Sequence, residues 1–307
     1  MVEGSGWRWP SGDEEGGKGG MRGFRGMWEY NCNLLIRKMR RLSNVLIIEI
    51  NDIIWDNKVD FFFNHNLDVI YHENFKITSV SLKTKNDLTK ISSDFYFFSC
   101  PFTEIVSKLN PQAPNRILDC CKKLRYRHHI GVKLEIHGPL FKDNWIYIHD
   151  PKVKMARISN YRNFSKNMSP DININPVTVE YFCYETDELW GFSDDDLIQL
   201  AEKELRLCGL LNEKNFIKRG FVIRSLKAYP VIKMGYEEPV EEIRRYLSQF
   251  TNLAIIGRSG MFKYNNQDHA IATGLYAARN VISGKNLIDI WKINSEGIYQ
   301  EGQVKDD

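Results

Sequence analysis

A short stretch near the C-terminal end of the chain combines residue types that could hold an anion or a nucleotide. Residues 252–274, NLAIIGRSGMFKYNNQDHAIATG, read as an apolar strand, a glycine turn, a polar aromatic loop and the start of a helix. Gly257 and Gly260 would let the backbone approach a ligand where a Cβ would collide. Arg258 offers a bidentate partner for a phosphate or a carboxylate. The stretch predicts either an anion site or only a tight strand-to-helix turn with solvated polar caps.

The helix after this turn is predicted over about residues 267–283. Asn265 or Asn266 can cap its first turn, where free N–H groups carry a partial positive charge. Such a helix end favours a phosphate or a ring that becomes anionic on reduction. Asp268 and His269 could hydrogen-bond hydroxyl groups of a ligand or substrate. The apolar spacing predicts burial of Ile271, Leu275, Ala278 and Ile282, and a thin face at Ala270, Gly274 and Ala277 against which a neighbour packs closely.

The amino-acid composition limits the classes of protein to which this chain can belong. The 307 residues carry a net charge of +3, and their Lys and Arg alternate with Asp and Glu, so a nucleic-acid partner is not indicated. The six cysteines form no C-x-x-C pair or zinc spacing, which is typical of a reducing compartment. The apolar runs are short or interrupted by charges. We therefore predict a cytoplasmic protein with no membrane span and no metal site, whose oligomeric state is not readable.

The order of elements favours a mixed α/β fold. Residues 1–26 are glycine-rich without apolar periodicity and are predicted to be a disordered tail. A helix is expected from Met27 to Leu42, followed by a strand in NVLIIEI, a hairpin in DVIYHENFKITSVSLKT and a helix from about Pro114. Several strands of one antiparallel sheet are predicted between Arg125 and Tyr184.

Two further helices separate this sheet from the opening stretch. Ser193 is the expected N-cap of the first, with Asp196 at the capping-box position and Gly209 at the stop. The second is the amphipathic segment PVEEIRRYLSQF. A ligand site is expected at the carboxyl end of the strand that follows this second helix.

Other polar residues near predicted strand ends are candidates for binding a substrate. Arg157, Asn160 and Tyr161 combine cationic, amide and aromatic groups that suit a polar or anionic molecule, although an exposed sheet edge would look the same. His128 and His129 are adjacent in a strand, so they face opposite sides and cannot chelate one metal together. Tyr229 could form an aromatic wall or simply pack.

Several segments together resemble a known family. GRSGMFKYNNQDHAIATGLYAARN is similar to the C-terminal flavin-binding segment of the FAD-dependent amine oxidoreductases, which include protoporphyrinogen oxidase-like and UDP-galactopyranose mutase-like proteins. LRYRHHIGVKLEI, FKDNWIYIHDPKVKMARISNYRNFS, VEYFCYETDELWGFSDDDLIQLAEKEL and KAYPVIKMGYEEPVEEIRRYL resemble that family in order and spacing. The resemblance covers roughly residues 26–282.

The resemblance implies FAD as cofactor and a partial Rossmann-like FAD domain interleaved with an antiparallel-sheet substrate domain. The implied division is 1–26 tail, 27–115 residual FAD-domain segment, 116–240 substrate-type domain, 241–285 C-terminal FAD-binding segment and 286–307 tail. The implied cofactor-binding residues are Gly257, Arg258, Ser259, Gly260, Asn266, Gln267, Asp268, His269 and Ile271. The implied substrate residues are Arg157, Asn160, Tyr161, Tyr229 and Tyr264, and no residue is assigned as catalytic.

The implied function is that of an FAD-dependent oxidoreductase acting on a small molecule. The family's G-x-G-x-x-G segment is not found in this sequence, so we interpret the chain as an N-terminally truncated form. Asn266 stands where the mutase branch has an Asp. The alternatives are a UDP-galactopyranose mutase-like flavoenzyme acting on a sugar nucleotide, and a non-catalytic binding module without flavin.

Overall fold

The computed structural model describes residues 60, 62–169 and 171–295. All of them except Asp60 belong to one compact unit, residues 61–307. The predicted tail at 1–26, the predicted helix Met27–Leu42 and the strand in NVLIIEI lie outside the described residues. The elements that follow all belong to the second unit.

A four-stranded sheet of order β3-β2-β1-β5 begins this unit. The predicted hairpin is confirmed, since β1 (Asn66–Glu73) pairs antiparallel with β2 (Lys76–Lys83). Asn74 and Phe75 both have a positive φ, so two residues suffice for the turn. The other two strands are β3 (Leu88–Ile91) and the short parallel β5 (Leu109–Asn110).

Three helices cover the core of this part, which contains residues such as Ile70, Phe102 and Ile243. They are α3 (Phe102–Ser107), α4 (Asn115–Lys123), which starts after Pro114 as predicted, and α7 (Glu237–Leu247), which confirms the second amphipathic helix.

Two short parallel strands, β4 (Tyr96–Phe98) and β11 (Leu253–Ile255), form a separate pair beside the four-stranded sheet. The side chain of Asn252 links this pair to β2, because its Oδ1 accepts from the N–H of Ile77 (2.8 Å) and its Nδ2 donates to the carbonyl of Ile77 (2.9 Å). The buried amide thus replaces a missing backbone partner of β2.

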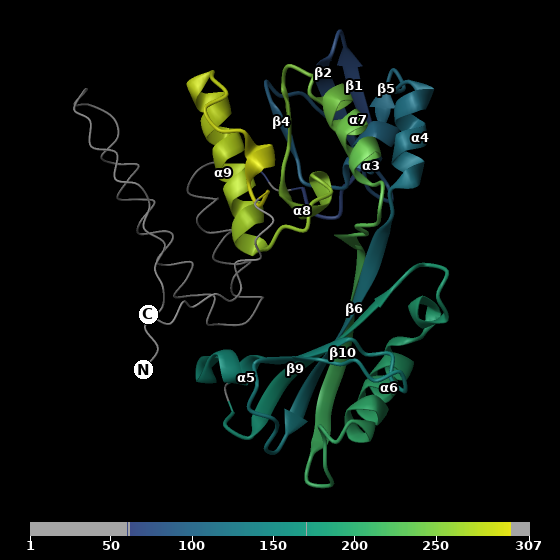
Figure 1. The fold of residues 1–307 in the computed structure, drawn as a ribbon, viewed down its shortest axis with the longest axis vertical. Coiled ribbons are helices and arrows are strands. Elements are labelled where there is room, and N and C mark those ends of the chain that lie inside the picture. The colour runs from purple at the N-terminus through teal and green to yellow at the C-terminus, as the bar shows by residue number, and fades with distance from the viewer. Residues whose placement is uncertain (1–59, 61, 170, 296–307) are drawn as a thin grey trace, which may run out of the picture. The chain divides into compact units, whose positions relative to one another are not determined.

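The predicted antiparallel sheet is confirmed and has the order β10-β6-β9-β8-β7. Figure 1 shows its two long strands, β6 and β10, running side by side. Alternation along β6 places Ile130, Val132 and Leu134 in an apolar core and His129 and Lys133 on the other face. The strands are β6 (Tyr126–His137), β7 (Trp145–Tyr147), β8 (Arg157–Asn160), β9 (Ile174–Cys183) and β10 (Phe216–Pro230).

Helix α6 (Asp194–Leu207) covers the apolar face of this sheet. Its predicted capping box is confirmed: Asp196 N donates to Ser193 Oγ (3.1 Å), and Ser193 N donates to the Asp196 carboxylate (3.3 Å). The buried carboxylate of Glu204 accepts hydrogen bonds from Lys154 N (2.6 Å), Met155 N (3.0 Å) and Tyr181 Oη (3.1 Å). Glu204 therefore fixes α6 to β9 and to the segment before β8.

The remaining elements are short, except for the last helix. Strand β11 leads into α8 (Gly257–Gly260) and then into α9 (Gln267–Ser283), which matches the predicted helix. The others are α5 (Tyr161–Phe164) and the turns η1 (Lys166–Met168), η2 (Glu188–Gly191) and η3 (Ile290–Lys292). Mixed parallel and antiparallel sheets with interspersed helices confirm the predicted mixed α/β fold.

Candidate functional site

The glycine turn after β11 forms one turn of helix, α8. Gly257 has a φ of +76°, a conformation that glycine adopts without strain. Its N–H donates to the Oγ1 of buried Thr273 on α9 (2.9 Å). A Cβ at Gly260 would lie 3.0 Å from the carbonyl oxygen of Phe98 at the end of β4. Both glycines thus have a structural reason within the fold, and the turn is tied to α9 and β4.

Arg258 extends from this turn, and its side chain contacts three other residues. Its Nε donates to the carbonyl of Asn265 (2.6 Å). Its guanidinium carbon lies 4.7 Å from the ring centre of Tyr229 and 5.0 Å from that of Tyr264. The terminal nitrogens form no hydrogen bond to any described residue, so the outer edge of the fork remains a bidentate donor.

The start of α9 presents several hydrogen-bond donors. The imidazole Nδ1 of His269 accepts from the N–H of Asn266 (3.2 Å), which closes the entry to the helix. The N–H groups of Gln267 and Asp268 have no acceptor among the described residues, as expected for a first helical turn. The buried side chain of Asn265 also has an amide nitrogen without a partner in this part of the chain. These donors suit an anionic or hydrogen-bond-accepting ligand.

The apolar face predicted for α9 is not the one it buries, whereas Ala277 of the predicted thin face is buried. Ile271 and Ile282 are 53% and 85% exposed, whereas Thr273 and Ala277 are buried. Residues two positions apart lie about 200° apart around a helix, so burial of Thr273 turns Ile271 outward. A Cβ added at Gly274 would lie 3.7 Å from the side chain of Ile256, which is an ordinary contact distance. The hydrogen bond from Gly257 N to Thr273 Oγ1 accompanies this rotation of α9, which the apolar spacing does not predict.

A connected segment clamps the loop between α8 and α9. Lys263 Nζ donates to the carbonyls of Trp291 (2.8 Å) and Ile293, and burial lowers its pKa. Asn294 Nδ2 donates to the carbonyl of Tyr264 (3.0 Å) and to Asn265 Oδ1 (3.2 Å). Residues in the segment predicted as a tail after 285 thus help to fix the position of Tyr264.

The predicted substrate residues on β8 and α5 are engaged with other protein groups. Arg157 donates from Nε and Nη2 to the two carboxylate oxygens of Glu180 (3.0 and 2.6 Å) and from Nη1 to Tyr147 Oη (3.3 Å). The side chain of Asn160 caps α5, and its buried amide nitrogen has no described partner. The hydroxyl of Tyr161 accepts from Lys133 Nζ (3.3 Å).

The charge of the Arg157–Glu180 pair is fixed by these contacts. Burial raises the pKa of Glu180, but hydrogen bonds from His129 and Arg157 outweigh that effect and hold the pKa below its usual value. Burial lowers the pKa of Arg157, and its hydrogen bonds to Glu180 and Tyr147 outweigh the burial and raise it. Both groups are therefore ionised at neutral pH.

Aromatic contacts join the helix start to the open face of the five-stranded sheet. The ring of Tyr229 lies 5.9 Å from that of Tyr264 and 5.2 Å from that of Phe182. Phe182 lies 5.5 Å from His129, which in turn approaches Glu180. The structure thus connects Arg258, Tyr229 and Tyr264 with the Arg157 cluster through residues that the sequence analysis did not assign. The missed residues are Phe182, Glu180, His129 and Lys133, and their signal is polar or aromatic character at alternate positions of two otherwise apolar strands.

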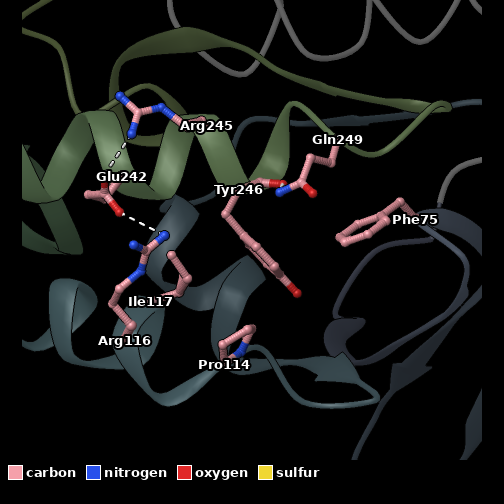
Figure 2. A pocket seen from close by; sticks show the side chains of 8 residues that line it. All are labelled: Phe75, Pro114, Arg116, Ile117, Glu242, Arg245, Tyr246 and Gln249. Atoms are coloured by element: carbon pink, nitrogen blue, oxygen red, sulfur yellow. Dashed lines mark hydrogen bonds and ion pairs between the residues drawn. The ribbon is translucent and has the colours of Figure 1, made fainter.

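Two hollows lie elsewhere in the described part of the chain. One, of about 250 Å³, lies between α4, α7 and the β1–β2 turn. Figure 2 shows its lining residues, among which Arg116 and Arg245 both pair with Glu242. This hollow contains none of the predicted site residues. The other, of about 620 Å³, lies beside Lys227 and His128. Neither hollow coincides with the donors of α9.

The described residues show neither a metal cluster nor a membrane-spanning helix. Among them, no three His, Cys, Asp or Glu side chains are grouped closely enough to hold a metal ion. No helix of the described part has the length and apolar character needed to cross a membrane.

The α/β fold of this chain is similar to that of solved mutase and oxidoreductase structures. The crystal structure of reduced UDP-galactopyranose mutase aligns with a TM-score of 0.64 at 17% identity, over 78% of this chain and 51% of that chain. An oxidoreductase from Methanosarcina mazei aligns with a TM-score of 0.52 at 10% identity, over 76% and 53%. The resemblance predicted from the sequence is confirmed at the level of the fold.

The same comparisons limit what is shared. This chain spans about half the length of each of these solved structures. No protein-family model and no curated protein sequence matches it. At such low identity the likeness concerns the fold alone.

Proposed function

We propose that this chain supplies the flavin-facing and substrate-facing parts of an FAD-dependent oxidoreductase. The observation that carries the proposal is the position of Arg258. Its Nε donates to the carbonyl of Asn265, just before α9, and its guanidinium lies over the ring of Tyr229 on the five-stranded sheet. A cofactor at the helix start and a substrate on the sheet would then be neighbours.

The residues at the helix start fit the hydrogen-bond-accepting edge of a flavin ring. The unpartnered, buried amide nitrogen of Asn265 and the free N–H groups of Gln267 and Asp268 are donors that require an acceptor. The positive end of the α9 dipole favours negative charge at the same place. FAD, when bound, would supply hydride acceptance from a C–N or C–C bond of the substrate.

The protein groups would bind and orient rather than react. Gly257, Ser259 and Gly260 shape the turn, and Ser259 is anchored to β6 because its carbonyl accepts from Tyr126 Oη (3.1 Å). Arg258 would hold a phosphate or carboxylate oxygen with its outer nitrogens. His269 closes the helix entry, and Ile271 offers an exposed apolar surface beside it.

Direct binding tests the proposal. Lumiflavin carries the isoalloxazine ring alone and FAD carries the whole cofactor, so titrating the full chain with each probe, followed by flavin fluorescence, measures the ring contacts separately. We expect both to bind, and Arg258→Gln to weaken FAD binding by about tenfold because a charge-assisted hydrogen bond is lost.

A matched control is Arg245→Gln, which removes an arginine from the hollow in Figure 2. Its affinity for FAD should equal that of the unsubstituted chain. If the chain leaves the fluorescence of both lumiflavin and FAD unchanged at saturating concentrations, the proposal is refuted and a flavin-free binding module is favoured.

A mutase-like function on a sugar nucleotide is the second candidate, because the UDP-galactopyranose mutase fold aligns over more than three quarters of this chain. UDP titration distinguishes the two: binding of UDP that is lost in Arg258→Gln and kept in Arg245→Gln would favour the mutase-like function.

A further inference from the structure

A glycine in the centre of the open sheet face lets neighbouring side chains pack close to the strand. Gly131 lies in β6 and pairs with Glu180 on β9 and with Ile223 on β10. A Cβ at this position would lie 3.2 Å from the Cε1 of His129 and 3.7 Å from the Cε of Lys133. The absence of a side chain therefore lets the side chains of His129, Thr178 and Lys133 lie close over the strand.

The imidazole of His129 is oriented by a buried carboxylate. Its Nε2 lies 3.2 Å from Glu180 Oε2, and the side chain of Glu180 is only 8% exposed. Because the carboxylate is ionised and accepts hydrogen bonds, Nε2 carries the proton in the neutral imidazole. Arg157 bonds both oxygens of Glu180 and prevents the carboxylate from turning away. This leaves Nδ1 of His129 as the accepting nitrogen.

Nδ1 of His129 has no hydrogen-bond partner among the described residues, and 19% of the His129 side chain is exposed. An oriented imidazole with one nitrogen on a carboxylate and the other open is the arrangement of a general base, since the carboxylate stabilises the imidazolium that forms. The adjacent His128 differs in its exposure and in the contact of its Nδ1, although its Nε2 also lies 3.8 Å from a carboxylate oxygen of Glu185. Its side chain is 7% exposed, its Nδ1 accepts from Lys227 N (2.9 Å), and its ring contacts Trp190.

The groups around His129 give this part of the sheet face a positive charge. Lys133 Nζ is held by Thr178 Oγ1 (2.8 Å) and by Tyr161 Oη. The other charged or titratable groups that face His129 from neighbouring strands and from its own strand are Glu180, Arg157, Arg127 and Tyr229. Three cations against one carboxylate favour an anionic ligand.

We propose that the sheet face around His129 and Lys133 is an acid–base site for a small anionic molecule that carries an O–H or N–H group. Lys133 binds the anionic group, and His129 Nδ1 accepts the proton. In that step the O–H or N–H bond of the ligand breaks, its electron pair stays on the ligand atom, and a new N–H bond forms on the imidazole. No electron leaves the ligand. A ligand of this kind would be the substrate class of the proposed oxidoreductase, and to that extent the inference rests on the proposed function.

Chemical modification tests the site without flavin. Diethyl pyrocarbonate acylates accessible imidazole nitrogens, and peptide mass mapping at pH 7 separates the two adjacent histidines through His128→Gln and His129→Gln variants. We expect His129 to react at least about tenfold faster than His128, and glycolate, a small hydroxy acid, to protect it. Lys133→Met should abolish the protection while circular dichroism shows an unchanged fold. Equal reactivity of the two histidines, or protection that survives Lys133→Met, would overturn the proposal.

Calorimetric titration with glycolate supplies a second readout. Lys133→Met removes a charge-assisted contact and should weaken glycolate binding by about tenfold, whereas His128→Gln should leave the affinity unchanged. Unchanged affinity in Lys133→Met would also overturn the proposal. Both readouts are taken without FAD, so failure of flavin binding leaves them informative.

Discussion

Removing one hydroxyl should loosen the turn at Gly257 by a predictable amount. Thr273 Oγ1 accepts from Gly257 N and donates to the carbonyl of Ala270 (2.7 Å), and Thr273 is fully buried. Thr273→Val keeps the shape of the side chain but strands the buried Gly257 N–H, at a cost of about 1 to 3 kcal/mol. The methyl group that replaces the hydroxyl returns up to about 0.8 kcal/mol. The expected net loss is about 1 to 2 kcal/mol.

Amide hydrogen exchange by NMR measures this loss at the atom concerned. A local cost of about 1.4 kcal/mol raises the opening equilibrium about tenfold, so the Gly257 amide should exchange about tenfold faster in Thr273→Val. Thr273→Ser, which keeps the hydroxyl, is the matched control and should leave that amide protected. Exchange of the Gly257 amide within twofold of the unsubstituted chain in Thr273→Val would refute the role given to this hydrogen bond.

Three other predictions concern buried ionisable groups. Glu204→Leu leaves three donors without an acceptor, two of them buried, and should lower the free energy of unfolding by about 3 to 5 kcal/mol in urea titrations, whereas Leu207→Ala on the exposed side of α6 should change it little. Since the pKa of Glu180 is lowered in the fold from 4.5, its stabilising contribution is complete above about pH 4.5 and is lost as pH falls below that value; Glu180→Gln should flatten this part of the acid-unfolding curve. Burial raises the pKa of Cys100 from 9.0 to about 11, so at pH 8 iodoacetamide should alkylate it about a hundredfold more slowly in the folded chain than in urea; similar rates in both states would contradict the burial.

The elements of the second unit follow from the sequence where a local signal is strong. The capping box at Ser193, the proline before α4 and the β-branched and aromatic residues of β6 and β9 each act within a few residues, and the structure confirms the elements that they predict. The rotation of α9 does not follow from such a signal. A hydrogen bond between Gly257 and Thr273, sixteen positions apart, accompanies it, and the sequence does not show that these residues meet.

The candidate site divides in the same way. Arg258, Tyr229 and Tyr264 are predicted individually, and the structure adds that they lie together. Arg157 looks like a free cation in the sequence, but the structure pairs it with Glu180, which lies in a different strand. The pairing depends on strand order, β8 beside β9 beside β6, and this order is decided by tertiary packing rather than by the residues near Arg157.

The irregular pairing near the end of β10 also constrains how the chain can vary in length. Ser225 is opposite His129 and Tyr229 is opposite Arg127, so four positions of β10 span two positions of β6. The surplus is therefore two residues, an even number, and Tyr229 stays on the side of the sheet that carries Phe182. A two-residue deletion at this bulge would preserve that side, whereas a deletion of one residue would turn Tyr229 towards α6 and separate it from Arg258. Homologous chains should accordingly differ here by even numbers of residues.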